Sequence, residues 1–360
     1  MENNQRKSSV ELLRIIAILL IVLSHSAPYY GDRSLISYLD LDSPTTNLSE
    51  MVVIFFRSLG QVGNVIFIAC SSWFLVDSKK VKIKKVLSLI LDLSIISVVF
   101  LGVFIGINGK ITEYYFNSSV FPLIYKDAYW FVVCYLLFYI VHPYLNKVID
   151  SSSKKELLTL NIIFIVLYSI VNIMHSTSFY YTELIGFFEI YFLVAYMKKY
   201  LDDFSNNKRK NVMLFIISLL LLIMYIMVKD IKLISVNSRH GMLDGIKLFN
   251  PFIILTSISL FNIFRNINIK SKIINYNAKQ SILIYLFTEN IFMRELIRPQ
   301  FFLKYYGNNI IILCIIEFVQ LVIFGYFCSI LYDITIRKIT KKVSDKISNE
   351  ISSKILESEE

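Results

Sequence analysis

The chain has 360 residues, of which 56% are hydrophobic and 18% are charged, and its formal net charge is +10. Its mean hydropathy is +0.60, whereas soluble domains carry about a quarter charged residues. This composition excludes an ordinary soluble globular protein, and most of the surface is expected to face lipid. The excess of lysine and arginine is accounted for by contact with anionic lipid and needs no nucleic-acid partner.

Ten apolar segments follow one another along the chain, and a segment of about twenty residues crosses a hydrocarbon core of about 30 Å. They centre on Val10–Ala27, Met51–Val76, Val86–Ile107, Ala128–Leu145, Leu157–Met174, Glu183–Met197, Val212–Val228, Leu248–Phe264, Gln280–Ile297 and Ile310–Tyr332. We therefore predict an all-α integral membrane bundle of about ten transmembrane helices, formed as one domain by residues 1–332. Residues 333–360 are expected to form a charged amphipathic tail on the inner leaflet.

The distribution of lysine and arginine predicts the orientation, because cytoplasmic loops are enriched in both. With the N-terminus inside, roughly 25 of these residues fall in inside segments and roughly 8 in outside segments. Both termini are therefore expected to be cytoplasmic. The first segment lacks a signal-peptide cleavage site and is expected to be retained as a membrane anchor.

Polar groups in the first segment are costly inside a membrane and usually face a cavity or a partner. Arg14 and His25 are eleven residues apart, so on a helix they share one face at depths about 16 Å apart. Arg14 is then nearer the cytoplasmic end and His25 nearer the outer end. Glu11 is the nearest possible partner of Arg14 by its i, i+3 spacing. A simpler interpretation, in which Arg14 reaches lipid phosphate and His25 is an interfacial residue, stays open.

The run of Arg14, ten residues and His25 resembles the R/K-x10-H motif of the acyltransferase-3 family, multi-pass bacterial membrane proteins that O-acylate sugars and cell-surface polysaccharides. Gly60-Gln61-Val62-Gly63 and then Phe67 to Leu75 are similar to the family's G-x-x-x-F-F-x-x-S-G-F/Y stretch. Ser71 falls on the family's serine, and the next residue is serine where the family has glycine.

Further matches follow in the family's order along most of the chain. Lys82 and Lys85 have the spacing of the R-x-x-R that many members carry in a basic cytoplasmic loop, with lysine in place of arginine. Trp130 looks like the start of the family's W-F segment. Ser281 to Leu286 resembles S-x-x-x-Y-L-x-H, with Thr288 where many members have histidine.

The resemblance implies a membrane O-acyltransferase, most simply an O-acetyltransferase of the bacterial cell membrane. It would transfer an acyl group from cytoplasmic acyl-CoA to a hydroxyl of a cell-surface polysaccharide or its lipid-linked precursor. Residues 1–332 are then an acyltransferase-3-like transmembrane domain. His25 is suited to act as the base because the pKa of histidine lies near neutrality. Arg14 is suited to bind the phosphates of the donor or to hold a carboxylate that positions the helix. No metal site and no permanently bound cofactor are expected, and the donor- and substrate-binding residues are expected to be Glu11, Ser71, Lys82, Lys85, Trp130 and Glu189.

The functional interpretation of other charged residues in or beside the apolar segments is less specific. Glu189 lies in the middle of a segment and has the strongest claim to a site. Arg294, Glu295 and Arg298 lie near a helix end, where surface pairs are expected. The segment from Arg239 to Asp244 is either a sugar-contacting loop or an ordinary solvated one. The four cysteines lie in apolar segments without C-x-x-C spacing, which favours packing roles.

The competing function is a polytopic transporter or flippase for a glycan precursor. Such proteins often contain internal pseudo-repeats, and none is evident in this sequence. A sensor or scaffold would not require Arg14 and His25 on one helix face. The sequence leaves open which acyl group and which hydroxyl are used, and whether the acyl group is transferred directly or through a covalent intermediate on Ser71 or His25.

Overall fold

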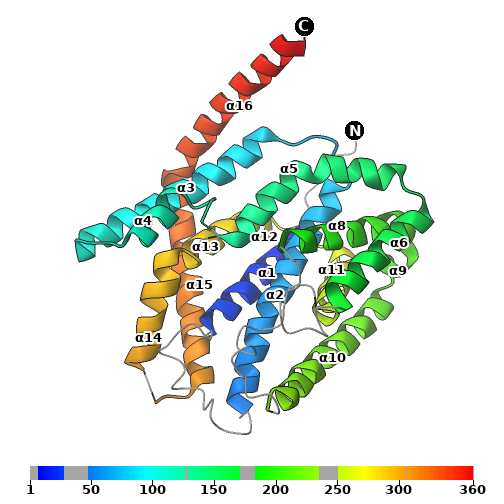
Figure 1. The fold of residues 1–360 in the computed structure, drawn as a ribbon, viewed down its shortest axis with the longest axis horizontal. Helices are drawn as coiled ribbons and strands as arrows, with labels where there is room; N and C mark the ends of the chain where they lie inside the picture. The colour runs from blue at the N-terminus through cyan, green and yellow to red at the C-terminus, as the bar shows by residue number, and fades with distance from the viewer. Residues whose placement is uncertain are drawn as a thin grey trace.

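The structure, a computed structural model of the chain, describes residues 7–27, 48–125, 129–170, 183–234, 250–305 and 307–359. Within these ranges every regular element is a helix and none is a strand. The predicted all-α class is therefore confirmed. Figure 1 shows the long helices gathered in a bundle, from which the last helix projects at the top of the view.

The helices differ widely in length, and two of the elements are short π-helical segments. In chain order they are α1 (Ser8–Ser26), α2 (Leu48–Leu75), α3 (Ile83–Asn108), α4 (Glu113–Val120), α5 (Trp130–Ser151), α6 (Lys154–Phe164), η1 (Ile165–Ile170), α8 (Glu183–Tyr200), α9 (Asp202–Asn206), α10 (Lys208–Ile234), α11 (Pro251–Arg265), α12 (Lys272–Ala278), α13 (Ser281–Thr288), η3 (Met293–Ile297), α14 (Arg298–Lys304), α15 (Ile310–Thr335) and α16 (Arg337–Glu359).

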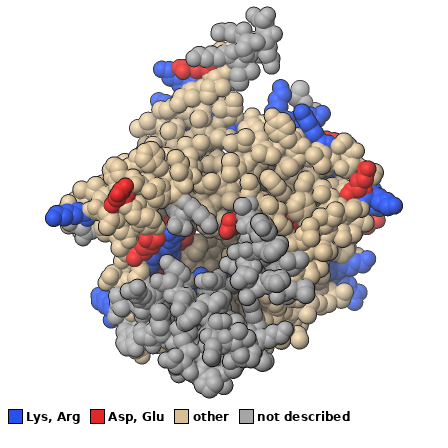
Figure 2. Space-filling model, viewed as in Figure 1, with Lys and Arg blue, Asp and Glu red and all other residues tan. Residues whose placement is uncertain are grey.

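Six helices in the described part of the chain are long and apolar enough to cross a membrane: Ser8–Ser26, Met51–Leu75, Ile83–Ile107, Trp130–Ser151, Lys208–Val228 and Ile310–Thr335. The chain is thus a multi-pass membrane protein, but these ranges do not supply the ten spans predicted. The remaining apolar segments are shorter or more polar than expected: α8 carries four charged residues, α11 has 15 residues, and residues 171–174 of the fifth predicted segment lie outside the described ranges. The described part of the face in Figure 2 is largely uncharged, with most of its blue and red side chains toward the edges of the view.

The predicted single helix over Gln280–Ile297 is interrupted at Glu289. α13 ends at Thr288, and the side-chain oxygen of Asn290 accepts a hydrogen bond from the backbone nitrogen of Phe292 at 3.1 Å. The hydroxyl of Tyr129 donates to the carbonyl oxygen of Leu286 at 2.9 Å and accepts from Nδ2 of Asn290 at 3.0 Å. Local side-chain bonds of this kind compete with helical geometry, so Glu289 lies in a turn instead of on a continuous helix.

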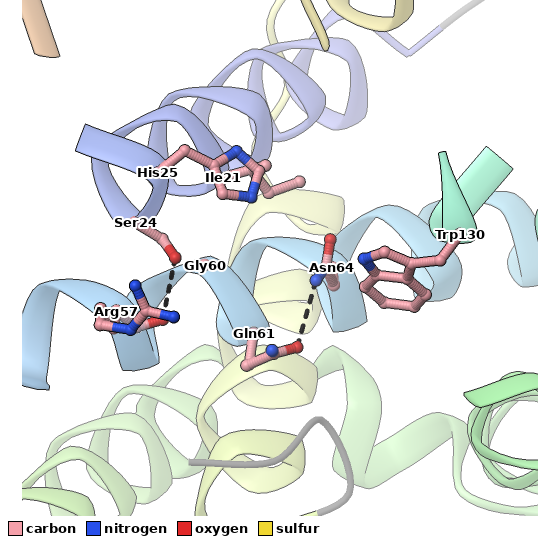
Figure 3. Close-up of a pocket in the computed structure, with 8 residues that line it drawn as sticks. All are labelled: Ile21, Ser24, His25, Arg57, Gly60, Gln61, Asn64 and Trp130. Atoms are coloured by element: carbon pink, nitrogen blue, oxygen red, sulfur yellow. Dashed lines mark hydrogen bonds between the residues drawn. The ribbon is translucent and has the colours of Figure 1, made fainter. Parts of the chain in front are cut away.

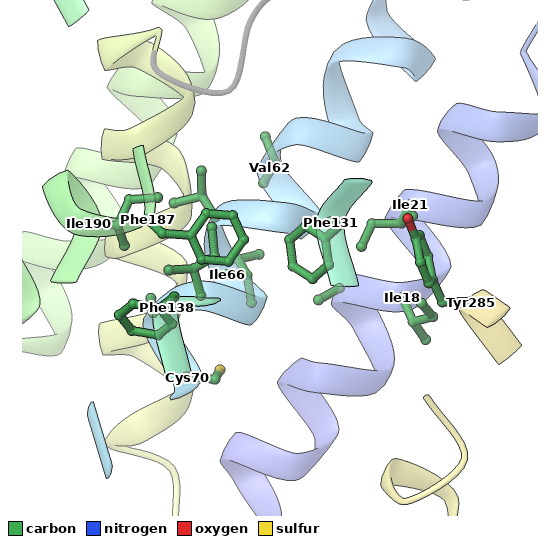
Figure 4. Packing of buried hydrophobic residues seen from close by; sticks show 14 of the residues in the cluster. Ile18, Ile21, Val62, Ile66, Cys70, Phe131, Phe138, Phe187, Ile190 and Tyr285 are labelled. Atoms are coloured by element: carbon green, nitrogen blue, oxygen red, sulfur yellow. The ribbon is translucent and has the colours of Figure 1, made fainter. Parts of the chain in front are cut away.

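Helix α1 lies at the centre of the bundle, in contact with α2, α11, α12, α13 and α15. Its Ile18 and Ile21 pack in one buried cluster with Ile66 of α2, Phe131 of α5 and Tyr285 of α13 (Figure 4). Lipid tails are as apolar as these side chains, so close packing rather than removal from water holds such helices together. The cluster packs α1 against these three neighbours and so fixes the depth of every polar group on it.

Two glycines let α1 and α2 approach very closely. A Cβ added at Gly63 would lie 2.5 Å from the carbonyl oxygen of Ala17, and one added at Gly60 would lie 2.3 Å from Cβ of Ser24. Both distances are shorter than real Cβ contacts, so no side chain fits at either position. Small residues at such an interface are typical of packed membrane helices, and here they place the end of α1 that carries His25 directly beside α2.

A buried carboxylate fastens the tail to the bundle. Asp92 of α3 accepts hydrogen bonds from the hydroxyls of Tyr332 and Thr340, both at 3.0 Å, and its Oδ2 lies 3.5 Å from Nε of Arg337. The described part of the predicted amphipathic tail, residues 333–359, thus comprises the end of α15 and the whole of α16. The position of this helix relative to a membrane stays a prediction.

Candidate active site

A cavity of about 170 Å³ lies where the C-terminal end of α1 meets α2 and the start of α5. Its lining residues are Ile21, Ser24 and His25 of α1, Arg57, Gly60, Gln61 and Asn64 of α2, and Trp130 of α5 (Figure 3). Pockets for drug-sized ligands measure about 300–1,000 Å³, so this one has room for the reacting end of a substrate only. Two residues predicted from the sequence to act in the site, His25 and Trp130, meet here.

The imidazole of His25 is held by a carboxylate from a distant part of the chain. Its Nδ1 lies 2.9 Å from Oε1 of Glu289, and the two side chains are 27% and 7% exposed, respectively. A proton on Nδ1 would face this carboxylate, and the lone pair would then be on Nε2. Figure 3 shows the ring reaching from α1 toward Gly60 and Asn64 of α2. His25 is therefore oriented, partly accessible and equipped to accept a proton at the cavity.

Arg298 fixes both members of this pair. Its Nη1 donates to Oε1 of Glu289 at 3.0 Å and to the backbone carbonyl oxygen of His25 at 3.1 Å. Its side chain is 9% exposed. The expectation that Arg298 forms a surface pair is therefore wrong, because the break after α13 turns Glu289 inward and the start of α14 brings Arg298 over it. Arg294 and Glu295 do pair with each other, at 2.8 Å, and are partly buried.

Helix α2 supplies polar groups to the opposite wall of the cavity. Nη1 of Arg57 donates to the carbonyl oxygen of Ala27 at 3.2 Å, and the carbonyl oxygen of Arg57 accepts from the hydroxyl of Ser24 at 3.1 Å. Nδ2 of Asn64 donates to Oε1 of Gln61 at 3.1 Å. Figure 3 shows the indole nitrogen of Trp130 on the side of the ring nearest Asn64. A cationic group and several N–H donors therefore surround the space in front of His25.

The other end of α1 carries the second predicted polar group. Nη1 of Arg14 donates to both carboxylate oxygens of Glu11, at 3.1 and 3.3 Å, as the i, i+3 spacing predicts. The guanidinium lies 5.9 Å from the ring centre of Phe74. Nε of Arg14 has no hydrogen-bond partner among the described residues, so donors remain for a further anionic group.

Ser71 and Glu189 are buried but do not line the His25 cavity. Oγ of Ser71 donates to the carbonyl oxygen of Phe67 at 3.0 Å, and Ser71 lies seven residues beyond Asn64 along α2, about 10 Å farther along the axis. Glu189 accepts a hydrogen bond from the hydroxyl of Ser169 at 2.6 Å. No histidine or carboxylate of the described residues forms a hydrogen bond with Ser71, so no base is placed to activate it there.

Lys82 and Lys85 stand at the start of α3, both exposed and outside the His25 cavity. The backbone nitrogen of Lys82 donates to the hydroxyl of Tyr139 at 3.3 Å. The segment from Arg239 to Asp244 lies outside the described residues. Within the described residues no group of three or more histidine, cysteine, aspartate or glutamate side chains is arranged to hold a metal ion.

The family model described as "Acyltransferase domain", Acyl_transf_3, matches residues 7–334. The chain belongs to the acyltransferase-3 family. The matched range contains every residue that lines the cavity, and also Glu289 and Arg298, which hold His25. Comparisons with curated proteins and with solved structures found no match.

Sequence reasoning placed Arg14 and His25 on one face of a helix in this acyltransferase, but it did not find the partner of His25. Glu289 and Arg57 are two of several charged residues in or beside apolar segments, and their positions alone do not indicate a partnership with His25. The one signal for Glu289 is that it directly follows Thr288, the position that departs from the family's S-x-x-x-Y-L-x-H pattern. A carboxylate adjacent to an expected polar site residue can reach a catalytic side chain when the helix ends there, as Glu289 reaches His25.

Proposed function

We propose that this protein is a membrane O-acyltransferase that transfers an acyl group, most simply acetyl, from cytoplasmic acyl-CoA to a hydroxyl of a cell-surface polysaccharide or its lipid-linked precursor. The observation that carries the proposal is the Glu289–His25 pair at the edge of a polar cavity. A positioned base with an orienting carboxylate is the arrangement that activates a hydroxyl for acyl transfer.

His25 acts as the general base. Nε2 removes the proton from the acceptor hydroxyl as its oxygen attacks the carbonyl carbon of the thioester. When the carbon–sulfur bond breaks, the proton passes from His25 to the departing thiolate, and the products are an ester and free CoA thiol. Glu289 keeps Nδ1 protonated and stabilises the imidazolium that forms between the two steps.

The polar groups of α2 and α5 are suited to the charge that develops on the thioester oxygen. Donors that surround a reacting carbonyl stabilise the tetrahedral intermediate most when they are fixed before the reaction and shielded from water. Arg57, Asn64 and Trp130 supply a guanidinium, an amide and an indole N–H around the cavity. Arg57 is the group best suited to this role, because it carries a full positive charge.

The donor enters from the end of the bundle that carries Arg14. Arg14 and His25 are about 16 Å apart along α1, so a donor with its phosphates at Arg14 must extend its thioester along the helix. The 170 Å³ cavity accepts only the acyl end. Direct transfer is favoured over a relay through Ser71, because Ser71 donates to a backbone carbonyl and lacks a base among the described residues.

The test is O-acetylation of surface glycans, measured by NMR, in cells that lack the protein and are complemented with wild type, His25→Ala or the control Glu113→Gln. Glu113 is exposed on α4, so its variant controls for expression of an altered chain. Loss of acetyl signals in the deletion and the His25→Ala strain, with rescue by wild type and Glu113→Gln at equal membrane abundance, supports the proposal. Unchanged acetylation in the deletion strain would refute O-acetyl transfer and direct attention to another acyl group or to the transporter alternative.

A further inference from the structure

A second, larger hollow lies at the end of the bundle near the start of α3 and the end of α5, away from the His25 cavity. Its volume is about 650 Å³, within the range of pockets that hold small ligands. Three lysines line it: Lys79 and Lys80, which precede α3, and Lys147 in the last turns of α5. Lys82 and Lys85, the pair with the R-x-x-R spacing, are not among its lining residues.

The charge of this hollow is uncompensated. None of its lining residues is acidic. Other lysines of the chain pair with carboxylates, as Lys198 does with Asp77 and Lys199 with Asp150. Lys79, Lys80 and Lys147 form no ion pair with any residue that the structure describes, and Lys147 lies 5.4 Å from the ring centre of Tyr144. Three lysines that line one hollow without acidic partners suit a phosphate group.

The rest of the wall is apolar and lies on helices that cross the membrane. Ile83 and Val86 belong to the candidate span Ile83–Ile107, and Ile140 belongs to Trp130–Ser151. Ile140 is 43% exposed, as is expected for a side chain that meets lipid. The lysines stand at the ends of the same two spans, where a membrane gives way to water. The hollow thus has a cationic rim and an apolar wall. A phospholipid can contact both, with its phosphate at the rim and its acyl chains along the wall, whereas a soluble phosphate can contact the rim alone.

We infer that this hollow is a binding site for an anionic phospholipid, with the headgroup phosphate between Lys79, Lys80 and Lys147 and the acyl chains along α3 and α5. Because the site shares no residue with the His25 cavity, the inference is independent of acyl transfer. The lipid would bind on the lipid-facing surface of the bundle, between α3 and α5.

The experiment is native mass spectrometry of the full chain in detergent micelles, titrated with phosphatidylglycerol or with phosphatidylcholine of the same acyl chains. The test variant carries Lys79→Ala, Lys80→Ala and Lys147→Ala. The control variant loses equal charge through Lys155→Ala, Lys208→Ala and Lys210→Ala, exposed lysines that do not line the hollow. A further arm adds inorganic phosphate or CoA as a soluble competitor.

The expected result is preferential binding of phosphatidylglycerol by wild type and the control variant, and at least about tenfold weaker binding by the test variant, since each basic residue near anionic lipid contributes substantially to binding. The soluble competitors should not displace the lipid. Three results would each overturn the inference: equal loss in test and control variants, equal binding of the two lipids, or displacement by phosphate or CoA, which would identify a soluble phosphate ligand instead.

Discussion

Nδ1 of His25 lies 2.9 Å from Oε1 of Glu289, a contact between the end of the first helix and a turn near the far end of the chain. The pair is held by Arg298, which donates to Glu289 and to the backbone carbonyl of His25. His25, its orienting carboxylate Glu289 and Arg298 therefore form one unit, in which each member has a separable role.

Glu289→Gln should leave the shape of the site nearly intact but remove the charge that orients and stabilises protonated His25. We expect the rate of acyl transfer to fall by about 10²–10⁴-fold, the usual contribution of a positioned general base, with little change in KM for acyl-CoA. The measurement is steady-state transfer from radiolabelled acetyl-CoA to glycan by the protein reconstituted in liposomes. Full activity of Glu289→Gln, with Glu113→Gln also active, would exclude a role for Glu289 in orienting the base.

Removing Arg298 should affect stability as well as rate. Arg298→Ala leaves the charge of Glu289 buried with one fewer partner, and breaking a buried ion pair costs about 3–5 kcal/mol of folding free energy. Thermal unfolding in detergent should show a clear decrease in midpoint. The double variant Glu289→Gln/Arg298→Met removes both charges, so it should recover much of the stability while remaining inactive. Recovery of activity in the double variant would contradict the catalytic role of the pair.

The close approach of α1 and α2 predicts which glycines tolerate a methyl group. Gly63→Ala would bring Cβ to 2.5 Å from a backbone oxygen that cannot move alone, so we expect a loss of about 1–3 kcal/mol, as for other overpacked sites. Gly102→Ala on α3 meets no atom within 4 Å and serves as the control. Thermal unfolding of the two variants should differ clearly. Equal midpoints would mean that the two helices are farther apart than described.

Arg14 and His25 should affect different kinetic constants, because they lie at opposite ends of α1. If Arg14 holds donor phosphates, Arg14→Ala should raise KM for acyl-CoA by about tenfold or more, since charge-assisted hydrogen bonds contribute about 1.5–3 kcal/mol, and should leave kcat less affected. Arg14→Lys should retain part of the affinity. The matched control is Arg209→Ala at the exposed start of α10. A fall in kcat at unchanged KM would instead assign Arg14 to the chemical step or to positioning of α1.

The sequence by itself determined that this is a helical membrane protein and that several polar residues of its site share one face of the first helix. A long run of apolar segments can be stable only as membrane helices, and helical geometry alone puts Arg14, Glu11 and His25 on one face, which the observed Arg14–Glu11 contact bears out locally. Such inferences succeed because they depend on periodicity within a single helix. The prediction of a continuous helix over Gln280–Ile297 was wrong, because a hydropathy pattern carries no information about the hydrogen bonds of Asn290 and Tyr129 at the end of α13.

Only the tertiary structure decided which residues share the cavity. Glu289 and Arg298 reach His25 because α13 stops beside α1 and the chain turns back. Arg57 and Asn64 line the cavity because two glycines bring α1 against α2, and Trp130 joins them from the start of α5. Separations of this kind depend on how helices from distant parts of the chain pack. A buried charge in a sequence shows that a partner is required, and the packing of the bundle determines which residue that partner is.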